Sequence, residues 1–247
     1  RAIPYRLVGG VRFYERQEIK DLLAYLRFFA NPQDELSFLR IVNVPPRKIG
    51  KKSVEELRAY ANTLSGGEMN AGQLLLTAWG LTSDGTNWEE YFPGQGISDE
   101  IIDRVKAHQD FEECSEKYAD LISLFGGLYE ESRKQNIREF IDEIIEQTGY
   151  EQWIDDGTPQ AEARKENLYE LKVVAEKHKA LGPRDSQLAF LEDVALVEQE
   201  QESEAVQGEN GKEGVTLMTL HSAKGLEFDV VCMVGLEEGL FPHVRSF

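Results

Sequence analysis

The sequence predicts a mostly helical protein in which a large all-α insert is flanked by two pieces of an α/β domain. Three observations support this prediction. Helical apolar patterns fill most of the chain between residues 17 and 198, and Gly and Pro pairs separate them. Residues 215–234 instead have the pattern of a β-strand, a polar turn containing glycine and a second β-strand. Strands that are apolar on both faces belong inside a parallel sheet covered by helices.

The first helices are predicted from apolar spacing and from the residues that end them. Residues 17–29 form an amphipathic pattern that ends at Asn31-Pro32, and residues 34–43 form a second one that Pro45-Pro46 ends. Residues 53–64 form a third, in which Ser53 and Glu56 have the spacing of a capping box. Ser65-Gly-Gly ends this third helix.

The second half of the chain is also predicted to be helical. Residues 80–97 are irregular, and four helical patterns follow at 98–125, 137–148, 161–181 and 186–198. The breaks between them are predicted at Gly126-Gly127, at Gly157-Thr-Pro159 and at Gly182-Pro183. The acidic run at 198–204 is predicted to be a helix end followed by a flexible linker.

Composition and charge narrow the class of protein. The chain has 247 residues, 41% of them hydrophobic, which is enough for one large or two small domains. It has no apolar run of 18 residues and no signal-peptide pattern at its start, so we expect a cytoplasmic protein with no membrane partner. Cys114 and Cys232 are predicted to be buried thiols of a reducing compartment rather than a disulfide. The spacing of His and Cys predicts no metal site.

The formal net charge of -18 opposes attraction of the whole molecule to DNA. Binding of nucleic acid would therefore need a local basic patch, and one cluster of cations lies between two predicted helices, with Glu55 and Glu56 nearby. Its members are Arg40, Arg47, Lys48, Lys51, Lys52 and Arg58.

The hairpin at residues 45–53 has the residues of a phosphate clamp. A helix that begins at Ser53 would present free backbone N–H groups and the positive end of its dipole. Gly50 allows close approach of a ligand to the backbone, Arg47 offers a guanidinium fork, and the lysines add point charges. The alternative interpretation is a solvated turn rich in lysine.

The turn inside 215–234 is the second candidate site, because ligands of open α/β sheets bind beyond the carboxyl ends of the strands. Its polar side chains are Thr219, His221, Ser222, Lys224 and Glu227. An ordinary solvated turn remains the alternative.

A third group is a polar and aromatic cluster that leads into the first helix. It consists of Phe13, Tyr14, Arg16, Glu18 and Lys20. The alternative is that both rings are core residues and that Arg16 is a surface ion-pair partner.

Three segments carry a resemblance to a known family. Residues 219–228, Thr-Leu-His-Ser-Ala-Lys-Gly-Leu-Glu-Phe, with Val-Gly-Leu-Glu-Glu-Gly-Leu-Phe-Pro-His at 234–243, resemble motif V and its continuation in superfamily 1 DNA helicases of the UvrD/PcrA/Rep family. Residues 3–21 resemble the segment that follows motif IV. Residues 42–50, Val-Asn-Val-Pro-Pro-Arg-Lys-Ile-Gly, are similar to the hairpin of the 2B subdomain that contacts duplex DNA.

The resemblance implies a division into subdomains. Residues 1–30 would be the first part of a RecA-like 2A domain, and residues 213–247 would be its second part with motif V. Residues 31–212 would be an inserted all-α 2B subdomain, with a helix–hairpin–helix-like element at 34–64. Phe13 and His221 would then lie in one body, and the insert would rotate about linkers near residues 30 and 212.

The resemblance also implies a role for individual residues. Glu227 would hydrogen-bond the ATP ribose, whereas Thr219, His221 and Lys224 would face single-stranded DNA. The residues at the duplex backbone would be Arg47, Lys48, Gly50, Lys51, Lys52 and Ser53.

The implied parent protein is an ATP-dependent 3′–5′ DNA helicase that unwinds duplex DNA in repair or replication, with ATP and Mg²⁺ as cofactors. The sequence lacks a Gly-x-x-x-x-Gly-Lys-Ser/Thr loop, because residues 208–213 are too short and end in Glu213. We therefore expect an internal fragment with no catalytic residues, which depends on the 1A and 1B motor domains of the same protein.

Two alternatives remain. The chain could be a stand-alone module that binds repair or transcription proteins and has no catalysis of its own. It could also belong to a helicase of recombination or coupled to a nuclease, although the match at residues 3–21 argues against this.

Overall fold

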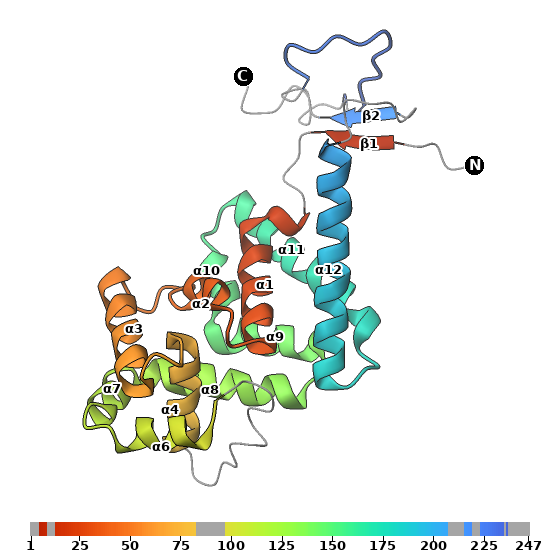
Figure 1. Ribbon diagram of the computed structural model, residues 1–247. Coiled ribbons are helices and arrows are strands. Elements are labelled where there is room, and N and C mark those ends of the chain that lie inside the picture. Colours follow the sequence, from red (N-terminus) through yellow and green to blue (C-terminus); the bar gives the residue numbers. More distant parts are fainter. Residues whose placement is uncertain are drawn as a thin grey trace. The chain divides into compact units, whose positions relative to one another are not determined.

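The computed structural model describes residues 5–8, 13–82, 97–206, 215–218, 223–234 and 236 (Figure 1). The chain divides into two compact units. One comprises residues 12–206, here called the helical unit, and the other comprises residues 1–11 together with 207–247, here called the strand unit. Each is described by itself.

The helical unit contains all the helices of the described chain, so the prediction of a mostly helical protein is confirmed. Two 3₁₀ helices, η1 (Phe13–Glu15) and η2 (Glu176–His178), accompany the α-helices. The α-helices are α1 (Gln17–Ala30), α2 (Glu35–Ile41), α3 (Lys51–Ser65), α4 (Ala71–Thr82), α6 (Asp99–Ala107), α7 (Phe111–Lys117), α8 (Ala119–Lys134), α9 (Ile137–Thr148), α10 (Tyr150–Ile154), α11 (Pro159–Ala175) and α12 (Pro183–Val206).

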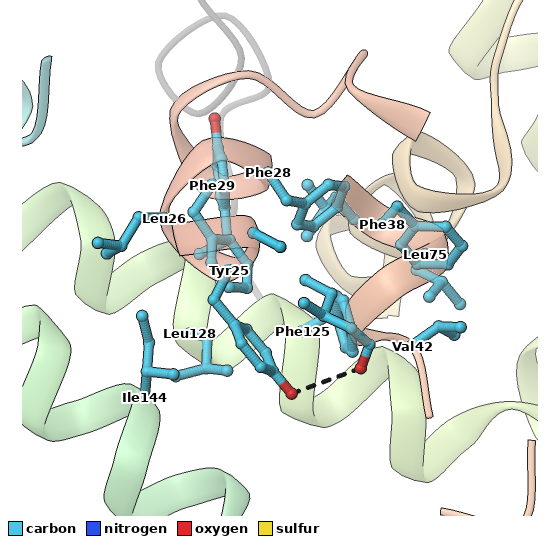
Figure 2. Close-up of a cluster of buried hydrophobic side chains, with 14 of the residues drawn as sticks. Tyr25, Leu26, Phe28, Phe29, Phe38, Val42, Leu75, Phe125, Leu128 and Ile144 are labelled. Carbon is cyan, nitrogen blue, oxygen red and sulfur yellow. Dashed lines mark hydrogen bonds between the residues drawn. The ribbon is translucent and has the colours of Figure 1, made fainter. Parts of the chain in front are cut away.

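Helix α1 is the centre of the helical unit, with α2, α8, α9, α11 and α12 packed around it. Its apolar residues are buried on nearly every side, and they include Tyr25 and Phe28. Figure 2 shows Tyr25, Phe28 and Phe29 packed together with Phe125 of α8. A helix buried in this way cannot be separated from the helices that cover it.

The two units of the structure divide after residues 11 and 206, whereas the subdomain boundaries that the resemblance implies lie near residues 30 and 212. The first and last helices of the helical unit are bonded directly. Gln187 donates from Nε2 to the carbonyl of Leu26 at 2.9 Å, and Arg27 pairs with Glu198 at 3.1 Å. Phe13 therefore lies in the helical unit. The resemblance had implied that it would lie in one body with the motif V segment.

The predicted helix at 98–125 is in fact three helices, α6, α7 and α8, interrupted at residues 108–110 and at Tyr118. The prediction that Gly126-Gly127 ends a helix is wrong, since α8 continues to Lys134. The physical reason is packing: a Cβ atom on Gly126 would overlap the indole ring of Trp79 on α4. Gly126 thus permits the close approach of two helices rather than a turn.

Other elements agree with the prediction or extend it. Helix α9 has the predicted bounds, and Asn136 caps it in a capping box with Glu139. Helix α12 continues through the acidic run to Val206, because Glu and Gln are good helix formers. Helix α4 was not predicted, since it is apolar and buried nearly all round and shows no amphipathic stripe.

The strand unit contains two short parallel strands from opposite ends of the sequence. Strand β1 (Tyr5–Val8) pairs with β2 (Val215–Met218) in the register Tyr5 to Val215 and Val8 to Met218. This strand pair is the part of the predicted α/β flanks that the described residues contain. None of the described helices belongs to the strand unit. The predicted second strand at 230–234 is not formed, and Val230 and Val234 are 81% and 90% exposed. No described strand lies beside it to accept its hydrogen bonds.

None of the described helices is long and apolar enough to cross a membrane.

Candidate nucleic-acid interface

The hairpin between α2 and α3 is held by side chains of its own flanks. The side-chain oxygen of Asn43 accepts hydrogen bonds from the backbone N–H groups of Arg47, at 2.6 Å, and of Ile49, at 3.1 Å. Ile49 and Val44 pack against the hydrophobic core. Lys48, between these anchored residues, has a φ of 62°, in the left-handed region that few side chains adopt. The backbone of the hairpin is therefore fixed from both sides.

Arg47 does not present the free guanidinium fork that was predicted. Its Nη1 donates to the carbonyl oxygens of Ile41 at 2.8 Å and Val44 at 3.1 Å, and its Nη2 donates to the hydroxyl of Tyr25 at 2.5 Å. The guanidinium is therefore engaged by two backbone carbonyls and a phenol of the chain itself.

Helix α3 begins at Lys51, two residues before the predicted start, and its N-cap is Gly50. The predicted capping box with Ser53 as N-cap is therefore wrong. Gly50 has no side chain to cap the helix, and the first intrahelical hydrogen bond joins the N–H of Val54 to the carbonyl of Gly50. The amides of Lys51, Lys52 and Ser53 precede that bond and have no helical partner. Such amides, at the positive end of a helix dipole, bind anions well.

The lysines of this hairpin are exposed and unpaired. No described ion pair or hydrogen bond engages the side chains of Lys48, Lys51 or Lys52. Two other cations of the predicted patch are engaged: Arg40 with Asp21 at 2.7 Å and Arg58 with Glu35 at 2.7 Å. Within the predicted patch, the cations without a described partner are therefore the three lysines of the hairpin.

The carboxylate of nearby Glu56 is paired with a cation that does not belong to the hairpin. Its carboxylate bonds the ammonium of Lys117 and accepts from the hydroxyl of Tyr118 at 3.4 Å. The Lys117 hydrogen bond is the main reason why the pKa of Glu56 is below its ordinary value. Tyr118 also donates to the carbonyl of Ser53 at 3.0 Å, which ties α7 to the first turn of α3.

The second candidate site is only partly described. Thr219, His221 and Ser222 lie outside the described residues. Lys224 is exposed inside a turn in which the N–H of Leu226 bonds the carbonyl of Ala223 at 3.0 Å, and Glu227 is exposed just after this turn. Gly225, inside this turn, has a φ of 85°, which favours glycine. One exposed carboxylate beside one lysine is not a nucleotide site, so the described residues alone do not form one.

The cluster near the start of α1 is structural. Phe13 and Tyr14 form an edge-to-face pair with ring centroids 5.1 Å apart, and Tyr14 is buried. The guanidinium of Arg16 bonds the side chain of Asn167 on α11. The side chain of Asn167 in turn donates from Nδ2 to buried Glu18 at 2.5 Å. This supports the interpretation of Phe13 and Tyr14 as core residues. Lys20 is exposed.

Sequence reasoning missed the two residues that organise the hairpin, Asn43 and Tyr25. Asn43 stands two residues before Pro45-Pro46, and Asn close to Pro is a turn signal that favours side-chain bonds to nearby backbone. Tyr25 reaches the hairpin from the preceding helix, and no local pattern reports such a contact.

The whole sequence points to one class of protein. The chain belongs to the UvrD-like helicase C-terminal domain family, which matches residues 1–247. Its resemblance to UvrD/PcrA/Rep helicases is thereby confirmed.

Two individual relatives are ATP-dependent DNA helicases that are longer than this chain. It is 36% identical over 249 residues to the ATP-dependent DNA helicase PcrA of Staphylococcus aureus (strain NCTC 8325 / PS 47), which covers 99% of this chain. It is also 36% identical over 248 residues, or 98% of this chain, to the ATP-dependent DNA helicase PcrA of Bacillus subtilis (strain 168). The chain spans 29% of the length of each of these relatives.

Proposed function

We propose that this chain is part of an ATP-dependent 3′–5′ DNA helicase and that residues 48–53 hold the backbone of duplex DNA. The observation that carries the proposal is the combination of three unpaired, exposed lysines with the uncapped amides of α3. This is a local cationic surface on a chain whose net charge is -18. Homology to the PcrA helicases supports DNA as the ligand.

The chemistry of this surface suits phosphate. The amides of Lys51, Lys52 and Ser53 would donate to phosphate oxygens, and the exposed position of Gly50 leaves the backbone open to a close approach. The lysine ammonium groups would add charge without fixed geometry. Contacts of this kind position a duplex without reading its sequence, as unwinding of any sequence requires.

The remaining assignments follow the family. Residues 1–30 and 213–247 would belong to the 2A half of the motor and residues 31–212 to the 2B insert, which would move relative to the motor and regulate it during DNA repair or replication. Thr219, His221 and Lys224 would face the single strand, and Glu227 would bond the ribose of ATP. The phosphates of ATP and Mg²⁺ would be held by the 1A and 1B domains of the longer protein.

The test is duplex binding by the 247-residue chain, measured by fluorescence anisotropy over a range of salt concentrations. We expect the triple variant Lys48→Glu/Lys51→Glu/Lys52→Glu to lose most of the binding. The wild-type affinity should fall with salt, with a slope of about 0.9 in log K against log salt for each phosphate contacted. The triple variant should show a smaller slope.

A matched control carries the same change in net charge elsewhere. Lys20, Lys106 and Lys177 are also exposed, and no described ion pair engages them. The variant Lys20→Glu/Lys106→Glu/Lys177→Glu should keep most of the wild-type affinity. Equal losses in both triple variants would show that only net charge matters and would refute the clamp. Binding unchanged by the hairpin substitutions would favour a protein-interaction module instead.

A further inference from the structure

We propose that Arg47 and Tyr25 form a brace that positions the lysine hairpin for phosphate, and that Arg47 is a positioning residue rather than a phosphate ligand. The part of this inference that concerns DNA rests on the proposed function. The part that concerns the hairpin rests on the geometry of the free protein, so the two can be tested separately.

The guanidinium of Arg47 is bonded at both ends. Helix α2 ends at Ile41, and the last carbonyls of a helix have no partner within it. Nη1 of Arg47 lies 2.8 Å from the carbonyl oxygen of Ile41 and 3.1 Å from that of Val44. A cation at this position also complements the negative end of the helix dipole. Arg47 therefore joins the end of α2 to the first residues of the hairpin.

Tyr25 completes the brace from the core. Its side chain is 0% exposed and stacks against Phe29, with ring centroids 6.4 Å apart. The hydroxyl accepts from Nη2 of Arg47 at 2.5 Å and donates to the carbonyl of Val44 at 2.5 Å. Burial raises the pKa of Tyr25 to about 12, so the phenol keeps this proton at neutral pH. The hairpin is thus anchored to the rigid central helix α1.

The brace also orders the residues that follow Arg47. The backbone N–H of Arg47 is held by Asn43, and the side chain of Arg47 is held by Ile41, Val44 and Tyr25. With Arg47 fixed at both its backbone and its side chain, Lys48 keeps its left-handed conformation and the amides at the start of α3 keep their direction. A lysine at position 47 would retain the charge but could not join two carbonyls and a phenol at once.

The experiment compares Arg47→Lys and Tyr25→Phe with the wild-type 247-residue chain. Duplex binding is measured by anisotropy at low salt, and backbone hydrogen exchange of residues 43–53 is measured without DNA. Tyr150→Phe is the control, because it also removes a buried phenol that bonds a polar group, Asp21, away from the hairpin. All variants are compared at a temperature at which exchange in α8 and α9 shows that they are folded.

We expect Arg47→Lys to weaken duplex binding about tenfold and Tyr25→Phe about threefold, because each loses hydrogen bonds that involve a charged group. Exchange should accelerate at residues 43–53 in both variants. Tyr150→Phe should bind as the wild type does, with unchanged exchange in the hairpin.

Wild-type affinity in Arg47→Lys would overturn the inference, because it would mean that charge at position 47 is sufficient. Unchanged exchange at residues 43–53 in both variants would also overturn it. If the wild-type chain binds no duplex, or if the hairpin Lys→Glu variant binds as well as wild type, the proposed function fails. In that case the exchange measurement alone still decides whether Arg47 and Tyr25 order the hairpin.

Discussion

Tyr150 on α10 donates a hydrogen bond of 2.7 Å to Oδ2 of Asp21 on α1. Asp21 is 2% exposed, and its other carboxylate oxygen accepts from Nε of Arg40 on α2 at 2.8 Å. One buried carboxylate thus joins α1 to the next helix in the sequence, α2, and to the distant helix α10. A buried charge of this kind is tolerated because each of its oxygens has a partner.

Replacement of Asp21 by Ala should destabilise the helical unit strongly. The change leaves the phenol of Tyr150 without its partner and removes the only described acid bonded to Arg40. We expect the free energy of unfolding, measured in urea, to fall by about 3 kcal/mol. Glu35→Ala breaks the exposed pair with Arg58 and should cost only about 0.5 kcal/mol. Similar losses in the two variants would contradict this interpretation of Asp21.

Gly126→Ala should destabilise the protein although alanine favours helices. The new methyl group would overlap the ring of Trp79, so α4 and α8 would have to separate. We expect a loss of about 2 kcal/mol in the free energy of unfolding, typical of overpacking in a core. Thermal and urea unfolding followed by circular dichroism would measure it.

Gly127 gives the matched control one residue further along α8. A Cβ atom there would lie 3.6 Å from Oε1 of Gln147, an ordinary contact. Gly127→Ala should therefore stabilise the protein by roughly 0.5 kcal/mol, through lower chain entropy in the unfolded state. A stabilising effect of Gly126→Ala would show that the α4–α8 contact is looser than described.

Cys114 should make stability depend on alkaline pH. Burial raises the pKa of its thiol from 9.0 to about 12. Between these two pH values the folded protein therefore keeps a proton that the unfolded chain releases. The contribution of the protonated thiol to the free energy of unfolding is complete below pH 9.0 and is lost as pH rises toward about 12. Cys114→Ala removes this titration, so its free energy of unfolding should fall less steeply with pH above 9.0.

The measurement for Cys114 is urea unfolding of both proteins, under reducing conditions, from neutral to alkaline pH. Tyr25, with a pKa that burial raises to about 12, contributes equally to both curves. The difference between the curves therefore reports the thiol together with its effect on Tyr60, because the charge of Cys114 is one of the causes that raise the pKa of Tyr60. Curves that stay parallel through this range would refute the prediction.

The 247-residue chain should not hydrolyse ATP, with or without single-stranded DNA. Its sequence has no phosphate-binding loop of the Gly-x-x-x-x-Gly-Lys-Ser/Thr type. A coupled assay of ADP release would test this, with a longer PcrA helicase as the positive control. DNA-dependent turnover that co-purifies with the chain would require a nucleotide site that the sequence does not indicate.

Local signals predicted much of the helical unit. Helix α9 was placed correctly because its apolar spacing and its cap at Asn136 are both local features. The hairpin was placed correctly because prolines separate two periodic segments and because its lysines are consecutive or nearly so. Both features act within a few residues, so they can be recognised from a single sequence.

Features that depend on distant contacts were not predicted. Arg47 resembles a phosphate ligand in the sequence, but carbonyls and a phenol from the folded chain engage it. Gly126 resembles a helix break, but Trp79 from another helix requires a residue without a Cβ atom. The sequence also does not reveal that the apolar residues of α1 are buried on nearly every side.

The pairing of Tyr5 with Val215 has a consequence for biosynthesis. Strand β1 is synthesised before α1–α12, whereas its partner leaves the ribosome only after all of these helices have emerged. The helices make nearer contacts and can collapse first, while closing the long loop between the strands carries a large entropic cost. The strand pair should therefore form last during co-translational folding, and β1 should wait unpaired until then, within reach of chaperones.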